Sequence, residues 1–171
     1  MVRRADGLVQ VIRKHGDYHG HVVEWPVKNR KDWDRVKRAH LQAEDPSRFP
    51  PDWPDHVRTF RTRDYPLQLT HGGVYGFARN LMGDENLAYA FYDDPALVHD
   101  IMDSYTDMAI RIWSKMCAVV EFDLIECWED MASKNGSIIS PATFREFMTP
   151  NYRRIAAFAK EHGIATCVRM P

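Results

Sequence analysis

The first 64 residues alternate short apolar runs with polar turns, and then become strongly charged. Residues 8–12 and 22–25 are rich in Val, Leu and Ile, and the polar stretch 15–20 separates them, which predicts a β-hairpin. Residues 28–43 are charged with a minority of apolar positions, so they predict a surface helix. Residues 44–55 hold four prolines and should lack regular structure, and a short helix is expected over 55–63.

From residue 65 onward the pattern becomes strand, helix, strand, helix, strand. Buried strands are predicted over 65–70, 122–126 and 164–168, and helices over 74–82, 85–92, 95–119 and from Pro141 to about Gly163. Crossovers of this length make the strands parallel, in an α/β layer or barrel. We therefore expect two parts: a hairpin and helical cover over 1–64, and a (β/α) unit over 65–171.

The boundaries of the two longest helices carry specific signals. Asp94 stands at the N-cap of the helix over 95–119, followed by a proline at the first helical position, and apolar residues then recur at three- and four-residue spacing. Ser140 and Pro141 open the last helix in the same way. We expect that helix to bend at Pro150 and to end at Gly163.

The composition is that of an ordinary globular protein and excludes several classes of function. The 171 residues are 44% hydrophobic and 27% charged, and the formal net charge of −1 offers no basic field for nucleic acid. No stretch approaches the roughly 18 apolar residues of a membrane span, and no apolar signal core follows the first residues. Cys117, Cys127 and Cys167 lack CxxC spacing and indicate buried, reduced thiols. These features predict a cytoplasmic protein without nucleic-acid or membrane partners.

Acid–base residues gather where the predicted strands end. His71 follows the first strand, and Glu126, Glu129 and Asp130 follow the second. In parallel α/β folds the chemistry collects at the carboxyl ends of the strands, so these four are the candidate catalytic residues. Each has a structural alternative, and Glu126 at its strand end would, like His71, be a structural residue. His71 would be a hydrogen-bonded structural histidine, Asp130 would cap a turn, and Glu129 would pair with Lys134 in solvent.

A second group of residues has the chemistry to hold a substrate. Arg79 could meet an anionic group or form an ion pair that holds its loop. Trp128 and Tyr75 could line a pocket for a flat substrate, or pack in the core. Lys134 and Asn135, in a Lys-Asn-Gly turn beyond the second strand, complete the predicted substrate-binding set.

Several separated motifs resemble one family, in the right order. They are GFARNLMGDENL at 76–87, AFYDDPALVH at 90–99 and WEDMASKNGSIISPATFREFMTPNYRRI at 128–155. This pattern is similar to the uroporphyrinogen decarboxylase superfamily, which includes the cobalamin-dependent methyltransferases. The resemblance covers residues 65–163, and more loosely the hairpin and the Asp-Pro-Ser-Arg-Phe-Pro stretch. It implies a (β/α)8 barrel, of which this chain holds the first part.

The resemblance also implies a class of reaction. Members transfer methyl groups or decarboxylate small anionic or methylated substrates, and members are about twice as long as this chain. Relatives continue after the third strand with an Asp-x-Asp-Gly or His-x-Cys-Gly segment, where this chain has Arg169 and Met170. The methyltransferases bind zinc through a His, a Cys and a later Cys, and work with a corrinoid protein, whereas the decarboxylases need neither.

Two functions therefore stay open. The first is an enzyme, or part of one, that uses no cofactor held within this chain; zinc and a corrinoid would belong to a full-length methyltransferase. The second is a non-catalytic half-barrel that functions by association with another chain. Half-barrels expose strand edges, so a homo-oligomer is expected.

Overall fold

The computed structural model describes residues 1–4, 7–11, 21–129 and 131–169. Its described strands form a three-stranded antiparallel sheet, a three-stranded parallel sheet and a two-stranded hairpin. The strands are β1 (Val2–Arg3), β2 (Val9–Val11), β3 (His21–Glu24), β4 (Gln68–His71), β5 (Leu124–Trp128), β6 (Ala132–Ser133), β7 (Gly136–Ser137) and β8 (Ala165–Arg169). The helices are α1 (Arg30–His40), a 3₁₀ turn (Pro46–Arg48), α2 (Trp53–Arg61), α3 (Val74–Met82), α4 (Asp84–Asp93), α5 (Pro95–Cys117), α6 (Pro141–Thr143), a π segment (Phe144–Met148) and α7 (Thr149–Glu161).

The predicted amino-terminal hairpin is confirmed in the described residues. Strands β2 and β3 pair antiparallel, with Val11 opposite His21, and the predicted turn at 15–20 lies outside the described residues. The sequence pattern did not reveal β1, which pairs antiparallel with β2. The proline-rich stretch is also more regular than predicted, because it holds the 3₁₀ turn and the start of α2.

Helix α1, predicted as a surface helix from its many charges, packs more closely against the protein than that prediction implied. Asn29 caps it by accepting a hydrogen bond from the backbone N–H of Asp32, and Trp33 is fully buried. The carboxylate of Asp100 on α5 accepts hydrogen bonds from Trp33 Nε1 (2.8 Å), Arg30 Nη1 (2.6 Å) and Lys37 Nζ (2.7 Å). This one acid therefore fastens α1 to α5.

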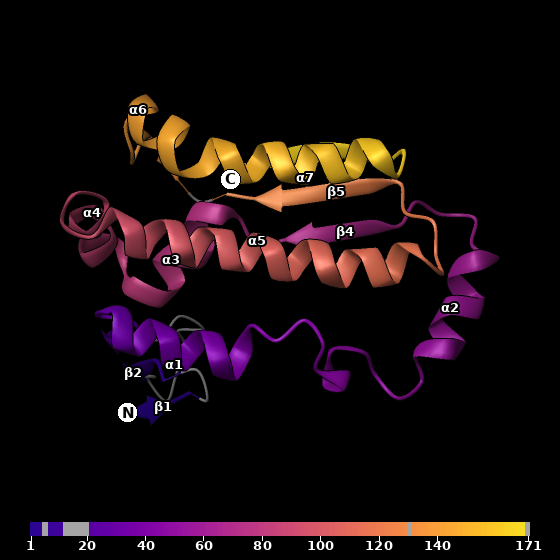
Figure 1. The fold of residues 1–171 in the computed structure, drawn as a ribbon, viewed down its shortest axis with the longest axis horizontal. Helices are drawn as coiled ribbons and strands as arrows, with labels where there is room; N and C mark the ends of the chain where they lie inside the picture. The colour runs from indigo at the N-terminus through magenta and orange to yellow at the C-terminus, as the bar shows by residue number, and fades with distance from the viewer. Residues whose placement is uncertain (5–6, 12–20, 130, 170–171) are drawn as a thin grey trace.

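The parallel sheet has the order β4-β5-β8, which confirms the predicted partial (β/α) barrel. Helices α3, α4 and α5 connect β4 to β5, and α6, the π segment and α7 connect β5 to β8. In Figure 1 the arrowheads of β4 and β5 point toward the end of the molecule where α4 and α6 lie, and α2 lies at the opposite end. Long helices α5 and α7 run alongside the strands.

The helix boundaries follow local capping chemistry. The side chain of Asp94 accepts a hydrogen bond from the N–H of Leu97 at the start of α5, and Ser140 does the same for Thr143 at the start of α6. The irregularity expected at Pro150 lies just before it, in the π segment that ends at Met148. No helix in the described part of the chain is both long and apolar enough to cross a membrane.

One face of the parallel sheet is covered by helices. Leu69, Ile125 and Cys127 point from β4 and β5 into a cluster with Trp113 of α5 and Phe158 of α7. A second cluster joins α1, α3, α4, α5 and the π segment. The residues that alternate with Leu69 and Ile125 therefore point to the opposite face, which the two clusters leave uncovered.

Asp123 ties the three strands together where they begin. Its carboxylate accepts hydrogen bonds from the N–H of Leu67 (2.7 Å) and from Arg63 Nη2 (2.9 Å). Its own N–H donates to the carbonyl of Leu67 (2.9 Å), and its carbonyl accepts from the N–H of Ala165 (3.1 Å). The approaches to β4, β5 and β8 are thus fixed by one residue.

Candidate functional site

A row of polar side chains crosses the uncovered face of the parallel sheet. Thr70, Glu126 and Cys167 are register partners on β4, β5 and β8, and Gln68 stands two residues before Thr70 on the same face. The amide of Gln68 donates to Glu126 Oε2 (3.2 Å) and to Thr70 Oγ1 (3.4 Å). We call these four residues the polar row. It places a half-buried carboxylate beside amide, hydroxyl and thiol groups.

The end of β5 and the hairpin that follows it carry three of the residues predicted to bind substrate. Trp128 ends β5 two residues after Glu126, with 38% of its surface exposed. Lys134 and Asn135 form the exposed turn between β6 and β7, where the N–H of Asn135 donates to Ser133 Oγ. Trp128 and Glu126 thus share one strand face, while Lys134 and Asn135 lie on a separate hairpin.

Glu129 lies inside the protein rather than on the rim. Its side chain is fully buried, and it accepts hydrogen bonds from the backbone N–H groups of Val74 (2.5 Å), Tyr75 (3.0 Å) and Gly76 (3.2 Å) and from the hydroxyl of Tyr152. The alternative that Glu129 pairs with Lys134 in solvent is therefore wrong. A carboxylate at the amino terminus of α3 satisfies the unpaired N–H groups of the first turn and complements the helix dipole.

Gly73 makes this close approach possible. Its φ of 81° lies in the left-handed region, and a Cβ at this position would collide with the carbonyl of Trp128 and the carboxylate of Glu129. The loop from β4 into α3 can therefore press directly against the end of β5. The Gly-Gly sequence after the first strand is the local signal for this contact.

Burial disfavours the charged form of the Glu129 carboxyl group, and its hydrogen-bond donors favour it. Burial raises the pKa of Glu129, while the hydrogen bonds from Tyr152 and from the α3 backbone lower it, and the net direction is upward. Burial and the neighbouring carboxylate raise the pKa of Tyr152, so its hydroxyl stays protonated and donates. All of the described contacts of Glu129 hold α3, β5 and α7 together.

His71 points into the helix-covered side of the sheet, opposite to the polar row. Its ring lies 4.4 Å from that of Tyr105 and 5.8 Å from that of Trp113, between centroids. Neither ring nitrogen has a hydrogen-bond partner among the described residues, and burial lowers the pKa of His71 to about 4. The imidazole is therefore neutral at pH 7. His71 and Glu126 were predicted to share one site, yet the sheet separates them.

Two further predicted residues lie on α3. Tyr75 is buried in the core at 2% exposure, and Arg79 is half-buried with its Nε 4.0 Å from Asp84 Oδ1. Asp130, the fourth predicted catalytic residue, lies outside the described residues. Of the predicted site residues, the structure brings Glu126 and Trp128 together on the uncovered face.

Sequence reasoning missed three members of the polar row and the partner of Glu129. Gln68 and Thr70 stand in a segment predicted as an apolar strand, and the signal for them is their alternation with the apolar Leu69. Cys167 was predicted to be a buried thiol but is exposed, and its neighbour Thr166 is polar, so alternation gives no signal for it. Tyr152 carries no local signal, because its contact with Glu129 is made across 23 residues of sequence.

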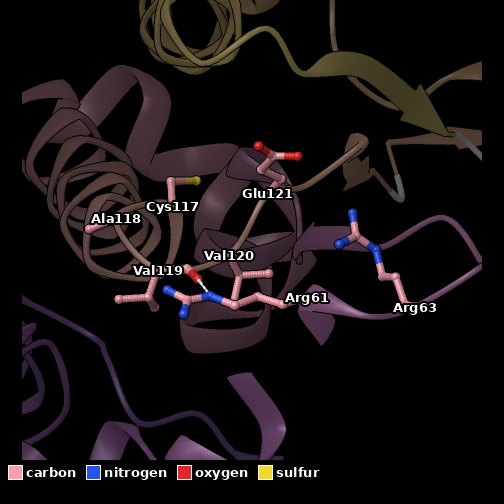
Figure 2. A pocket seen from close by; sticks show the side chains of 7 residues that line it. All are labelled: Arg61, Arg63, Cys117, Ala118, Val119, Val120 and Glu121. Atoms are coloured by element: carbon pink, nitrogen blue, oxygen red, sulfur yellow. Dashed lines mark hydrogen bonds between the residues drawn. The ribbon is translucent and has the colours of Figure 1, made fainter. Parts of the chain in front are cut away.

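A cavity of about 390 Å³ lies at the opposite end of the strands, between α2 and the end of α5. Figure 2 shows Arg61 and Arg63 entering it from one side and Cys117 to Glu121 from the other. Both arginines form hydrogen bonds within the protein. Arg61 Nε donates to the carbonyl of Val119 (2.9 Å), and Arg63 binds Asp123 and the carbonyl of Phe60. Arg61 thus binds a carbonyl just beyond the carboxyl terminus of α5, and Arg63 links the end of α2 to the residue before β5.

The described residues do not fit a zinc site. Nowhere in the described chain do three or more His, Cys, Asp or Glu side chains converge as metal ligands. Cys127 and Cys167 lie on opposite faces of the sheet, because Cys167 is in register with Glu126. A tetrahedral zinc site needs its ligands on one face within about 2.3 Å of the ion.

Comparisons with known proteins agree with this architecture. The sequence profile of the family described as uroporphyrinogen decarboxylase (URO-D) matches residues 13–169, and no curated protein matches the sequence. A methyltransferase from Methanosarcina mazei has a similar fold, with a TM-score of 0.60 at 17% sequence identity. The similarity covers 89% of this chain and 43% of that one, so this chain spans less than half the length of that methyltransferase. Because the family profile covers most of its length, the chain belongs to the uroporphyrinogen decarboxylase family.

Proposed function

We propose that this chain supplies three neighbouring strands of a barrel enzyme that transfers a methyl group from, or decarboxylates, a small anionic or methylated substrate. The observation that carries the proposal is the polar row on the uncovered face of the sheet. The face toward the helices is mainly apolar, with His71 as its buried polar residue, whereas this face presents Glu126, Gln68 and Thr70. In barrels of this type the face away from the helices lines the barrel interior, and the substrate binds at the carboxyl ends of the strands. Glu126 lies two residues before Trp128, the last residue of β5.

Glu126 has the chemistry for proton transfer in either reaction. Decarboxylation leaves an electron pair on carbon that must accept a proton, and methyl transfer from oxygen or nitrogen leaves a group that must be protonated. A carboxyl group held by the amide of Gln68 can deliver that proton, and Trp128 offers an aromatic face beside it. A small-molecule substrate and, for methyl transfer, a corrinoid protein are the proposed partners.

Replacement of Glu126 by Gln tests this proposal. CO2 release from carboxylated substrates and methylation of cob(I)alamin by methylated substrates would be measured with wild type, Glu126→Gln and the exposed control Glu161→Gln. Loss of general acid–base catalysis lowers the rate by about a hundredfold or more, so Glu126→Gln should do so at unchanged melting temperature. Equal rates in the wild type and the Glu126→Gln variant would contradict the role of Glu126.

Association with another chain is the second candidate function. Within the described residues, β4 and β8 each pair with β5 on one side only, and Val168 at the edge strand is 48% exposed. Unpaired strand edges are templates for pairing with a second chain. For this candidate the half-barrel is non-catalytic and functions only by association, so we expect a homo-oligomer by light scattering. A monomer at all concentrations would exclude this candidate.

A further inference from the structure

An apolar hollow opens beside the carboxyl end of β5, separate from the polar row. It has a volume of about 560 Å³ and is lined by Met131, Ala132, Gly136, Ser137, Ile139, Ser140, Pro141, Phe144 and Arg145. This volume lies within the range of small-molecule sites, roughly 300 to 1,000 Å³. None of Gln68, Thr70, Glu126 or Cys167 is among its described lining residues.

The polar groups in the walls of the hollow form hydrogen bonds within the walls. Ser137 Oγ donates to the carbonyl of Ile139 (2.7 Å), and the N–H of Ile138 donates to the carbonyl of Met131 (2.8 Å). Ser140 Oγ accepts from the N–H of Thr143 and shares a hydrogen bond with its hydroxyl. The hollow therefore presents mainly carbon to a ligand, from Met131, Ala132, Ile139, Pro141 and Phe144.

Among the described residues of this lining, Arg145 supplies the one cationic group. It is exposed at the start of the π segment, and it makes no ion pair with any described residue. A guanidinium beside an apolar wall favours a ligand with an apolar body and a carboxylate, sulfonate or similar anionic group, because it can donate two parallel hydrogen bonds to two oxygens.

The wall that carries Arg145 is also unusual in its backbone. The π segment widens the helix between α6 and α7, and Thr149 Oγ1 donates to the carbonyl of Phe144 within it (3.3 Å). The aromatic ring of Phe144 stacks on Tyr152 at 6.0 Å between centroids. Single π turns occur often at functional sites, and this one places Phe144 and Arg145 side by side on the hollow.

We propose that the hollow binds a small apolar anion. The body of the ligand contacts Met131, Ile139 and Phe144, and its anionic group pairs with Arg145. This inference goes beyond the proposed function, because it needs neither turnover nor any residue of the polar row. It assigns the β6–β7 hairpin and the π segment a role as the two walls of a binding site.

Fluorescence titration with 8-anilinonaphthalene-1-sulfonate, an apolar anion, tests the proposal on the intact chain. Binding should be saturable with one site per chain, and octanoate should displace the dye better than octanol, which has the same chain length without the charge. Dye binding without saturation, or equal displacement by octanoate and octanol, would overturn the proposal.

Two arginine variants separate the specific ion pair from general electrostatics. Arg145→Met should weaken dye binding by about tenfold, since a charge-assisted hydrogen bond contributes about 1.4 kcal/mol. Arg153→Met removes the same charge from an exposed position on α7 outside the hollow and should leave binding unchanged. Equal effects of the two variants would refute the role of Arg145. Ala132→Phe, checked for folding by circular dichroism, should fill the hollow and abolish binding.

Discussion

The hydroxyl of Tyr152 on α7 donates a hydrogen bond to the carboxylate of Glu129, which follows β5 and is fully buried. The same carboxylate accepts three backbone N–H groups from the first turn of α3. Three elements that are distant in sequence therefore meet at one charged group. The loops that surround the carboxyl end of β5 depend on this junction for their position.

Tyr152→Phe should destabilise the protein by about 2 kcal/mol, because a buried carboxylate loses one of its donors. Urea denaturation at pH 7 measures the change. Tyr89 on α4 is 62% exposed, so Tyr89→Phe is the matched control and should change the free energy of unfolding by less than about 0.5 kcal/mol. Similar values for both variants would show that the junction contributes little.

Gly73 and Gly163 offer a matched pair of substitutions. Both have positive φ, 81° and 70°, but an added Cβ at Gly73 collides with Trp128 and Glu129, whereas at Gly163 nothing lies within 4 Å. Gly163→Ala should cost about 1 kcal/mol from backbone strain alone. Gly73→Ala adds displacement of the end of β5 and should cost at least about 3 kcal/mol. Thermal unfolding distinguishes the two, and equal losses would contradict the packing argument.

His71 makes stability depend on pH in a defined direction. Burial lowers the pKa of His71 from 6.5 to about 4. The contribution of His71 to the free energy of unfolding is therefore fully present above pH 6.5 and is lost as the pH falls toward 4. Relative to His71→Phe, the wild type should lose about 3 kcal/mol over that interval. At pH 7 the variant should be at least as stable as the wild type, since it leaves no buried ring nitrogen unbonded.

The measurement is denaturant unfolding of the wild type and His71→Phe at several pH values between 4 and 7. His40 is exposed at the end of α1, so His40→Gln should follow the wild-type curve. Parallel curves for the wild type and His71→Phe would mean that His71 does not titrate as its burial requires.

Asp100 is expected to hold α1 against the rest of the protein. Partial burial raises the pKa of Asp100, but hydrogen bonds from Lys37, Trp33 and Ser104 outweigh it, and the net pKa is lowered. Asp100→Ala leaves Trp33 Nε1 buried without an acceptor and should cost about 2 kcal/mol. Hydrogen exchange should show the loss concentrated in α1, and uniform loss over α5 and α7 would contradict this assignment.

The sequence was informative wherever the deciding interactions are local. Asp94 and Ser140 correctly predicted the starts of the helices that they cap, and α3 has the bounds that were predicted for it. These predictions succeeded because capping and periodicity depend on residues that are close in sequence. The parallel direction of the strands followed from the length of the crossovers. The π segment was missed, since its residues are those of an ordinary helix.

The candidate site was harder to predict because it depends on which face of a strand each residue occupies. Apolar residues stand at consecutive positions in Leu124-Ile125, so alternation alone does not identify the covered face. His71 and Glu126 both lie near strand ends, yet they point in opposite directions. The contact of Glu129 with α3 and Tyr152 is long-range, and nothing near Glu129 in sequence indicates it.

The hydrogen bonds of Asp123 fix the register of the strands in the parallel sheet. Side chains on a strand alternate with a period of two, so a slip of one residue would turn the covered face outward. By binding both the N–H and the carbonyl of Leu67, and accepting from Ala165, Asp123 sets how β4 and β8 align with β5. The contacts that determine which residues face the uncovered side therefore lie at the amino-terminal end of the strands. A substitution at Asp123 would affect the surroundings of Glu126 by sliding β4 and β8 along β5.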